Sequence, residues 1–322
     1  MTRVGVAGLG HWGPNLARNF AELAELTWLC DSEPERRDIA SRYAQARFTS
    51  SFDEMLGDPE LDAVVVATPV PTHFELARRA LEAGKHVLVE KPPAMKGHEM
   101  DELVSLAAER DLVLMPGHLL LYHPGIRRVK DMIAAGELGD VLCVYGNRQN
   151  LGIIRSNENA LWSLGVHDLS VILYLLDEDP EQADAFGRDF LTSGVEDVVF
   201  CYLRFPSGKI AHMHLSWLDP HKMRRMTVVG TQKMAVFDDM ELDRKVTVYE
   251  KAPWKPVDTY GEWQTRTGDI HIPKIPTDEP LKLECRHFLS LVEGNGDRAR
   301  VARDGARVVR ALDMLTASLD GS

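Results

Sequence analysis

The chain is poor in the features that mark secreted, membrane-spanning and nucleic-acid-binding proteins. Its four cysteines lie far apart and form no C-x-x-C pair, so we expect reduced thiols of a cytoplasmic protein and no disulfide framework. No apolar run reaches the ~18 residues that a membrane-spanning helix needs. Lys and Arg number 37 against 49 Asp and Glu, and the net charge of -12 argues against nucleic acid or an anionic membrane as partner. A phosphate-bearing ligand stays open, because helix N-termini bind phosphate without side-chain charge.

Length and composition predict an ordinary globular protein. With 322 residues, 44% hydrophobic and 27% charged, the chain has ample material for two domains. A predicted strand begins at residue 3, which leaves no room for a signal peptide ahead of it. Neither an internal repeat nor a low-complexity tract is evident.

Strand and helix patterns alternate over residues 1–120. Short apolar runs predict strands, and amphipathic helical patterns lie between them. The predicted strands cover residues 4–7, 26–30, 61–67, 86–89 and 113–115. This β-α-β rhythm predicts a parallel sheet covered by helices on both faces.

The pattern changes after Pro124, so we assign residues 121–322 to a second domain. Its predicted strands cover residues 141–145, 198–205, 210–218, 226–229 and 245–249. Short turns join them, which favours an antiparallel sheet. Helices are expected at 161–176 and over the tail, 281–319, whose charges are well spaced and need no functional interpretation. Residues 251–280 are rich in Pro, Thr and Gly and predict an extended excursion, either an arm on a neighbouring subunit or a surface loop.

A glycine pattern follows the first predicted strand. Gly8, Gly10 and Gly13 fit G-x-G-x-x-G between that strand and the next helix, and Asp31 ends the following strand. Gly8 permits the tight turn, Gly10 lets a pyrophosphate approach the backbone, and Gly13 lets helix and strand pack closely. Asp31 is expected to accept hydrogen bonds from the adenosine ribose and to repel a 2′-phosphate, so NAD is favoured over NADP. The alternative is a glycine-rich turn that holds no ligand.

The motif Glu90-Lys91-Pro92 puts a charged lysine at the end of an apolar predicted strand, a place where charged residues are unusual. The motif follows the apolar run 86–89, and open α/β sheets bind ligands at the carboxyl ends of their strands. Pro92 disfavours helical backbone at Lys91, so we expect the lysine on an extended turn, where it orients a substrate hydroxyl or acts as a base. Thr68-Pro69 ends the central strand and is expected to form a wall of the cofactor site. The alternatives are a solvated lysine paired to Glu90 and a plain strand terminator.

The helix predicted at 161–176 contains the best acid/base candidate. His167 can relay a proton near neutral pH, although it shares a stripe with Leu164 and Val171, so a core histidine is the alternative. Neighbouring side chains on a helix point apart. Asp168 is therefore expected to face another element or bound substrate.

A dense polar stretch precedes this helix and suits a polyhydroxylated or anionic ligand, or is a solvated loop. It consists of Arg148, Asn150, Arg155, Asn157 and Asn159. His212 and His214 share one face of a predicted strand, but no third ligand has supporting spacing. We therefore expect structural histidines and predict no metal site.

Taken together, these residues resemble the Gfo/Idh/MocA oxidoreductase family over nearly the whole chain. The motifs that carry the resemblance are Gly8-x-Gly10-x-x-Gly13, Ala67-Thr68-Pro69, Glu90-Lys91-Pro92 and Gly165-Val166-His167. The resemblance implies an α/β fold, with an N-terminal Rossmann domain, a doubly wound parallel sheet, followed by a C-terminal α+β domain with an open, mainly antiparallel sheet. It also implies homodimers or homotetramers formed through that sheet, and oxidation or reduction of sugars, inositols or nucleotide sugars with NAD(P).

The resemblance further implies roles for individual residues. Lys91 and His167 are expected to carry catalysis. The residues expected to contact the cofactor are Gly8, Gly10, His11, Trp12, Gly13, Asp31, Thr68, Pro69, His73, Glu90 and Lys91. The residues expected to contact the substrate are Lys91, Arg155, Asn159, Trp162, Ser163, His167 and Asp168.

One position departs from the family pattern. Many members carry an aspartate four residues before this histidine, where this chain has Ser163, so the inositol and simple-sugar subgroups are less favoured. The stretches 150–155, 157–163 and 216–220 are similar to those of nucleotide-sugar 3-dehydrogenases, which oxidise C3 of UDP-N-acetylglucosamine or its uronic acid. Three alternatives stay open: a dehydrogenase of another sugar or cyclitol, an NAD-dependent glycosidase of the same family, and a redox-sensing protein that holds NAD without turnover.

Overall fold

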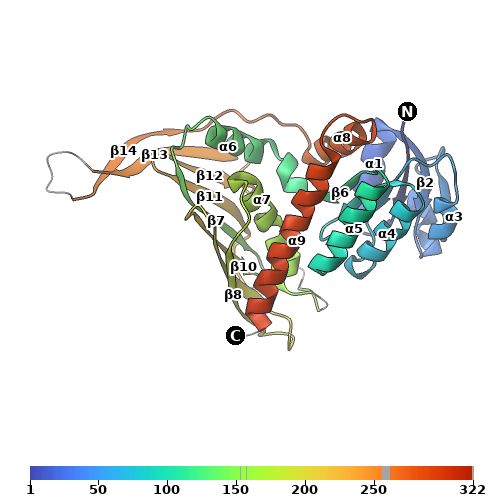
Figure 1. Cartoon of the computed structure of the whole chain (residues 1–322), viewed down its shortest axis with the longest axis horizontal. Helices are drawn as coiled ribbons and strands as arrows, with labels where there is room; N and C mark the ends of the chain where they lie inside the picture. Colours follow the sequence, from blue (N-terminus) through green and yellow to red (C-terminus); the bar gives the residue numbers. More distant parts are fainter. Residues whose placement is uncertain (153, 157, 256–261, 321–322) are drawn as a thin grey trace. The chain divides into compact units, whose positions relative to one another are not determined.

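The structure is a computed structural model that describes residues 1–152, 154–156, 158–255 and 262–320 (Figure 1). The chain divides into two compact units. Unit 1 comprises Met1–Tyr122 and Asp278–Arg310, and unit 2 comprises His123–Thr277 and Ala311–Ser322. The sequence predicts a single domain boundary between residues 120 and 121. In the structure, Asp278–Arg310 also belongs to the first unit, which that prediction does not include. Among the described residues, no helix is long and apolar enough to cross a membrane.

Unit 1 is built on a six-stranded parallel sheet with the order β3-β2-β1-β4-β5-β6. Its strands are β1 (Arg3–Ala7), β2 (Glu25–Cys30), β3 (Arg47–Thr49), β4 (Ala63–Val66), β5 (His86–Glu90) and β6 (Leu114–Gly117). The chain runs outward from β1 to β3 and then crosses back to β4. Right-handed crossovers therefore place the helices after β1 and β4 on opposite faces. The carboxyl ends of β1 and β4 flank the switch point at which such sheets bind ligands.

The helices of unit 1 bury apolar stripes against this sheet and against each other. They are α1 (Gly13–Leu23), α2 (Arg37–Ala40), α3 (Phe52–Leu56), α4 (His73–Glu82), α5 (Gly97–Glu109) and α8 (Pro280–Val292). In α1, Leu16 and Phe20 are fully buried. The Phe20 ring meets Phe288 of α8 edge to face at 6.1 Å, and Arg18 of α1 forms an ion pair with Glu279 at the start of α8. These contacts explain why α8 belongs to unit 1 although it follows unit 2 in sequence.

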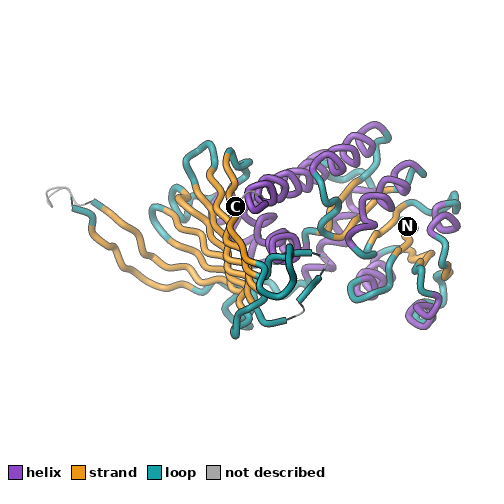
Figure 2. The backbone as a smooth tube through the Cα atoms, turned by 90° about the horizontal axis from the view of Figure 1, so that it is seen from below, coloured by secondary structure: helices purple, strands orange, loops and turns teal. Residues whose placement is uncertain are grey.

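Unit 2 is built on an eight-stranded sheet with the order β14-β13-β12-β11-β7-β10-β9-β8 (Figure 2). Its strands are β7 (Val141–Gln149), β8 (Gln182–Arg188), β9 (Val198–Arg204), β10 (Ile210–Ser216), β11 (Met223–Gly230), β12 (Met234–Asp238), β13 (Val246–Trp254) and β14 (Gln264–His271). Among the described strands of this sheet, β7 and β10 pair in parallel, and every other pair of neighbouring strands is antiparallel. Helices α6 (Pro124–Ala134) and α7 (Val166–Leu176) pack on one face of this sheet. The predicted fold, a parallel Rossmann sheet followed by a mainly antiparallel one, is confirmed.

The opposite face of the eight-stranded sheet carries aromatic side chains in register across its strands. Phe186 of β8 pairs with Phe200 of β9, and Phe200 pairs with His214 of β10. The His214 ring stacks on Phe200 at 4.3 Å, and His212 stacks on Tyr145 of β7 at 4.8 Å with an interplanar angle of 3°. The two histidines therefore have structural partners on this face, as the sequence predicts.

Strands β13 and β14 form a long hairpin at one edge of this sheet, labelled at the left of Figure 1. Every residue of β14 is exposed. This hairpin and the chain after it occupy the predicted excursion 251–280, of which residues 256–261 lie outside the described part of the chain.

The last helix, α9 (Arg298–Asp320), continues from unit 1 into unit 2, and the division between the units falls within it.

Candidate active site

The glycine loop after β1 has the geometry of a diphosphate cradle. Gly8 has a φ of +93°, and a Cβ there would lie 2.5 Å from the carbonyl carbon of Ala67. A Cβ on Gly13, the first residue of α1, would lie 1.8 Å from the Gly8 oxygen. Gly10, in contrast, faces open space, with no heavy atom within 4 Å of a Cβ built there. Since the first turn of α1 also has no acidic residue, its N-terminus is left positive for a phosphate group.

Asp31 ties this loop to the end of β2. Its Oδ2 accepts a hydrogen bond from the Leu9 amide at 2.6 Å, and its Oδ1 accepts one from the Glu33 amide at 2.9 Å. A carboxylate offers about four lone-pair positions, so both oxygens retain capacity for the hydroxyls of a ribose. The residues present thus fit a dinucleotide.

His73 holds two strand-end loops together and does not lie at the surface. It is only 1% exposed, and its ring nitrogens lie 2.7 Å from the Thr68 carbonyl oxygen and 2.8 Å from the Pro92 carbonyl oxygen. Burial lowers the pKa of this imidazole, the two carbonyl groups oppose that effect, and the nearby charge of Lys91 adds to it. The sequence predicts a cofactor contact for His73, and in the structure its ring also bridges the turns that carry Thr68 and Pro92.

Glu90 and Lys91 stand at the carboxyl end of β5, as predicted. The Trp12 side chain hydrogen-bonds the Glu90 carboxylate, and the Lys91 amide lies 3.4 Å from its Oε2. Burial raises the pKa of Glu90 to about 7, and the Lys91 charge, the Lys91 amide and the Trp12 bond oppose that rise. Trp12 and Glu90, both predicted to contact the cofactor, therefore form one structural pair beside the exposed His11.

His118 is a member of this site that the sequence analysis misses. It follows β6 directly, is 5% exposed, and its Nε2 has no hydrogen-bond partner among the described residues. Burial and the charge of Lys91 lower its pKa to about 4, so the ring is neutral at neutral pH. The available signal is its position, because it follows a predicted parallel strand just as Lys91 does.

In unit 2, an unusual helical turn precedes the predicted base. Leu161–Gly165 forms a π-helical turn that leads directly into α7, and such turns recur at functional sites. His167 lies in the first turn of α7, where Val166, Asp168 and Leu169 are buried but His167 is only partly so. Its backbone carbonyl accepts a hydrogen bond from the Ser170 hydroxyl at 2.8 Å. This placement departs from that of a core histidine, which is the alternative to a proton-transfer role.

Asp168 faces the sheet. Its Oδ1 accepts hydrogen bonds from Nε and an Nη of Arg148 in β7, at 2.8 and 2.7 Å. Both side chains are more than nine-tenths buried, and a Cβ on Gly146 would lie 2.8 Å from Oδ2. Burial raises the pKa of Asp168, and Arg148 opposes that rise. Of the two predicted alternatives for Asp168, the structure places it against another element.

Two further predicted substrate residues help to build the helix start. Trp162 is 5% exposed, and its indole donates to the Thr316 hydroxyl at 3.0 Å. Asn159 accepts a hydrogen bond from the Trp162 amide at 3.1 Å and donates to Glu196 at 2.7 Å. Both side chains thus have structural partners within unit 2.

The other two predicted substrate residues, Ser163 and Arg155, differ in how exposed their side chains are. Ser163 is 8% exposed, at the position where many family members carry aspartate. Arg155 forms an ion pair with Glu158 at 2.9 Å and leaves 47% of its side chain exposed, which makes it the more accessible of the two. Asn157, part of the predicted polar stretch, lies outside the described residues.

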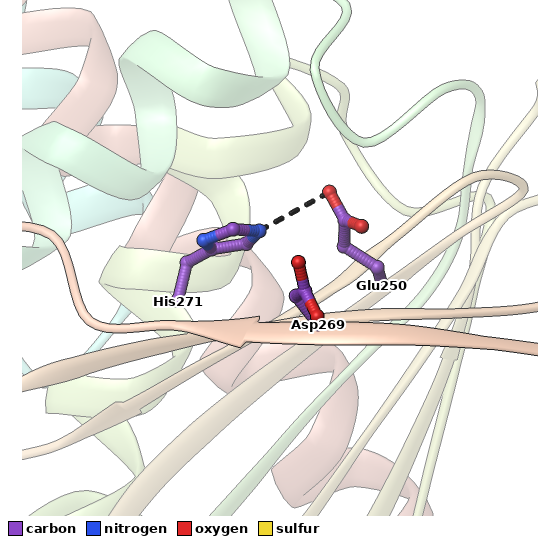
Figure 3. Close-up of side chains that lie close together, drawn as sticks. All are labelled: Glu250, Asp269 and His271. Atoms are coloured by element: carbon purple, nitrogen blue, oxygen red, sulfur yellow. Dashed lines mark ion pairs between the residues drawn. The ribbon is translucent and has the colours of Figure 1, made fainter.

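A separate cluster of possible metal ligands lies on the β13–β14 hairpin (Figure 3). Glu250, Asp269 and His271 each offer one ligand atom within 4.8 Å of the others. Lys233 already contacts Glu250 at 2.6 Å, and His271 lies 3.3 Å from the same oxygen. Because Glu250 has these partners and the other two side chains are exposed, we interpret the cluster as a surface ion-pair network.

Family models match both parts of the chain. Residues 2–118 match the oxidoreductase family with an NAD-binding Rossmann fold, and residues 126–236 match the GFO/IDH/MocA C-terminal domain. The chain belongs to the Gfo/Idh/MocA oxidoreductase family. This membership confirms the predicted family and fold, and it makes the loop from Gly8 to Gly13 part of an NAD-binding Rossmann domain.

Individual family members resemble the chain over much of its length. It is 30% identical over 239 residues to the UDP-N-acetylglucosamine 3-dehydrogenase of Acidithiobacillus ferrooxidans, covering 73% of this chain and 74% of that protein. A solved structure of that enzyme superposes with a TM-score of 0.83 at 26% identity, over 99% of this chain and 97% of that one. The 1,5-anhydro-D-fructose reductase of Ensifer adhaerens is 30% identical, over 80% of this chain and 77% of its own. GenD2 from gentamicin A biosynthesis, solved with NAD, has a TM-score of 0.82 at 26% identity, over 100% and 95% of the two chains.

Proposed function

We propose that this Gfo/Idh/MocA protein is an NAD-dependent dehydrogenase that oxidises the C3 hydroxyl of a UDP-N-acetylhexosamine or its uronic acid. The observation that carries the proposal is Lys91, a cationic side chain at the carboxyl end of β5, in the sheet whose first loop fits a dinucleotide. Similarity to the UDP-N-acetylglucosamine 3-dehydrogenase supports the choice of substrate class. Because Ser163 stands where many family members carry an aspartate, Lys91 and His167 would have to polarise and deprotonate the substrate hydroxyl without that carboxylate.

The cofactor preference follows from the glycine loop. The open space at Gly10 and the N-terminus of α1 would hold the diphosphate of NAD, and Asp31 would hold its ribose hydroxyls. A carboxylate at this position repels a 2′-phosphate, which favours NAD over NADP. Bound NAD supplies the acceptor for the hydride that leaves C3.

Lys91 and His167 divide the work on the substrate hydroxyl. The Lys91 ammonium donates to the substrate oxygen and stabilises the negative charge that develops there. His167 accepts the hydroxyl proton, because an imidazole near neutral pH can act as a general base. Arg155, with its exposed guanidinium, would contact the diphosphate or the carboxylate of the nucleotide sugar.

A thermal-shift panel tests the substrate class. A nucleotide sugar that completes a ternary complex raises the melting temperature only when NAD is also present, because a ligand of the native state stabilises it by mass action. UDP-N-acetylglucosamine and its uronate are expected to do so, whereas myo-inositol and glucose are not. Stabilisation by a free sugar or cyclitol alone would contradict the assignment. Release of the aryl group from an aryl glycoside, with no net NADH, would favour a glycosidase.

We infer that the aromatic face of the eight-stranded sheet joins copies of the chain into a homodimer or homotetramer. Phe186 and Phe200 stand in register on this face and are 62% and 51% exposed. Phe200→Glu is expected to shift the mass measured by light scattering toward the monomer. Phe190→Glu, at a side chain that is 65% exposed outside the strands, is the matched control. A wild-type monomer, or an unchanged mass in Phe200→Glu, would contradict this interface.

Reduced cysteines, free in the structure, support a cytoplasmic location.

A further inference from the structure

A buried ion pair joins the first turn of α7 to the eight-stranded sheet. Asp168, the third residue of α7, accepts two hydrogen bonds from the Arg148 guanidinium, and both side chains are more than nine-tenths buried. Burying two charges carries a desolvation penalty, and well-packed apolar side chains in their place are often as stable or more so. Stability alone therefore does not explain the pair, and its place in the fold calls for a further reason.

Arg148 stands on a strand that is fixed on both sides. In β7 it pairs with Leu215 of the parallel neighbour β10 and with Arg224 of the antiparallel neighbour β11. Its Nε and one Nη converge on Oδ1 of Asp168, at 2.8 and 2.7 Å. The other carboxylate oxygen, Oδ2, has no hydrogen-bond partner among the described residues. Within the described part of the chain, Arg148 therefore supplies the hydrogen bonds that fix where this carboxylate lies.

Two glycines let the start of α7 approach the sheet closely. Gly146 lies two residues before Arg148 and so on the same face of β7. A Cβ on Gly146 would lie 2.8 Å from Oδ2 of Asp168, so the carboxylate rests directly against the bare strand. Gly165 ends the π-helical turn ahead of α7, and a Cβ there would lie 2.7 Å from a leucine Cδ1 of β10. The helix start is thus held against the sheet both before and after His167.

His167 lies between these two anchored positions and is only partly buried. Successive residues of an α-helix are turned by about 100° around its axis, so fixing Asp168 also fixes the direction in which His167 leaves the helix. A rotation of the helix start by about 20° would move a side-chain tip about 6 Å from the axis by about 2 Å. Misplacing a reacting group by about 1 Å can lower a rate by about 100-fold.

We propose that Arg148 is a positioning residue of the dehydrogenase, which fixes the His167 imidazole for proton transfer by anchoring Asp168 to β7. This role rests on the proposed function, because the buried Arg148 acts on the substrate hydroxyl only through His167. Apolar packing is non-directional, whereas a guanidinium and a carboxylate meet in a defined geometry. An ion pair therefore suits a helix whose rotation must be fixed.

The split between kcat and KM with NAD and UDP-N-acetylglucosamine tests this role in the full chain. Arg148→Met is expected to lower kcat by about 10- to 100-fold and to change KM by less than about threefold, because the base moves while the substrate contacts remain. Gly146→Ala keeps both charges but displaces the carboxylate, so it should lower kcat by a smaller factor. A wild-type kcat in Arg148→Met, or in Gly146→Ala if Arg148→Met does not fold, overturns the proposal.

A double-mutant cycle shows whether Arg148 acts through His167. If it does, adding Arg148→Met to His167→Ala lowers the residual activity by less than about twofold. A further loss as large as that of Arg148→Met alone overturns the proposal. Leu175→Ala is the matched control, because it truncates a buried side chain at the far end of α7 and lowers stability without touching the ion pair. It is expected to keep the wild-type kcat, and a loss equal to that of Arg148→Met would also overturn the proposal.

A spectroscopic measurement that needs no turnover separates this role from the proposed function. In protein with isotope-labelled histidine, the magnetic resonance signal of the His167 imidazole is assigned by its loss in His167→Ala. Arg148→Met should shift or split this signal, and Leu175→Ala should leave it in place. A signal unmoved in Arg148→Met overturns the proposal even if the enzyme is active. If the signal moves but the wild type oxidises no nucleotide sugar, the proposed function fails, while the anchoring of His167 by Arg148 is upheld.

Discussion

Glu284→Gln should make the free energy of unfolding less dependent on pH. Burial raises the pKa of Glu284 in the folded chain far above its ordinary value of 4.5. The folded state then keeps a proton that the unfolded state releases, so the stability contributed by this group is full below about pH 4.5 and is lost as pH rises toward the folded pKa. Between those two pKa values the loss is about 1.4 kcal/mol per pH unit. Glutamine has the same shape and cannot ionise, so the variant escapes this loss.

The expected difference is large enough to measure. From about pH 5 upward, the free energy of unfolding of Glu284→Gln should rise relative to wild type by about 1.4 kcal/mol per pH unit, until the pH reaches the raised pKa of Glu284 in the folded chain. In a unit of this size, each pH unit corresponds to roughly 3–6 °C in melting temperature. Thermal unfolding at several pH values measures it, and the transition that NAD shifts upward identifies unit 1. The titration of Glu90 is common to both proteins and largely cancels in the comparison.

The control for this prediction is Phe288→Leu, which removes packing on the same helix but no titratable group. Its curve of stability against pH should run parallel to that of the wild type, displaced downward. If the curve of Glu284→Gln also runs parallel to wild type across this pH range, Glu284 is ionised in the folded protein and its pKa is not raised by burial.

Two further predictions concern the cofactor and the His167 helix. Asp31→Asn keeps one acceptor for the loop amides but removes the charge that repels a 2′-phosphate, so the ratio of NAD to NADP affinity, measured by cofactor fluorescence titration, should fall by about tenfold, or about 1.4 kcal/mol. An unchanged ratio would show that Asp31 does not face the ribose. Arg148→Met leaves Asp168 buried without its partner and should lower the free energy of unfolding by about 3–5 kcal/mol. Because burial raises the pKa of Asp168, that loss should be greater at pH 8 than at pH 5, and Arg148→Met/Asp168→Asn should recover part of it. A cost below about 1 kcal/mol in Arg148→Met, typical of an exposed pair, would contradict this account.

Local chemistry makes the cofactor loop predictable from sequence. Gly8 has a positive φ, and a Cβ on Gly13 would clash with the Gly8 oxygen. Both residues belong to the same short loop, so a short sequence pattern can reveal these restrictions. The strands that flank the loop are short apolar runs of a buried parallel sheet, so their positions follow from composition. Lys91 was predictable for the same reason, because it directly follows one of these runs.

Tertiary contacts decide the features that the sequence leaves open. No local pattern indicates that α8 returns to pack on α1, so the sequence alone places the tail in the second domain. In β14, every residue from Gln264 to His271 is exposed, so the alternation that marks a half-buried strand is absent. Asp168 and Trp162 lie beside the predicted base in sequence, but their partners, Arg148 and Thr316, lie 20 and 154 positions away. Glu284 is one of the well-spaced charged residues of the tail, so nothing in the sequence sets it apart. Its burial becomes evident only when α8 is packed in the structure.

We propose that Lys91 and His167 together promote the oxidation of a nucleotide sugar by NAD. The direct measurement is NADH formation from UDP-N-acetylglucosamine and its uronate by the wild type, Lys91→Ala and His167→Ala. We expect turnover by the wild type and a loss of about 100-fold or more in each variant, the contribution typical of a positioned acid or base. Activity at the wild-type level in both variants would contradict the claim.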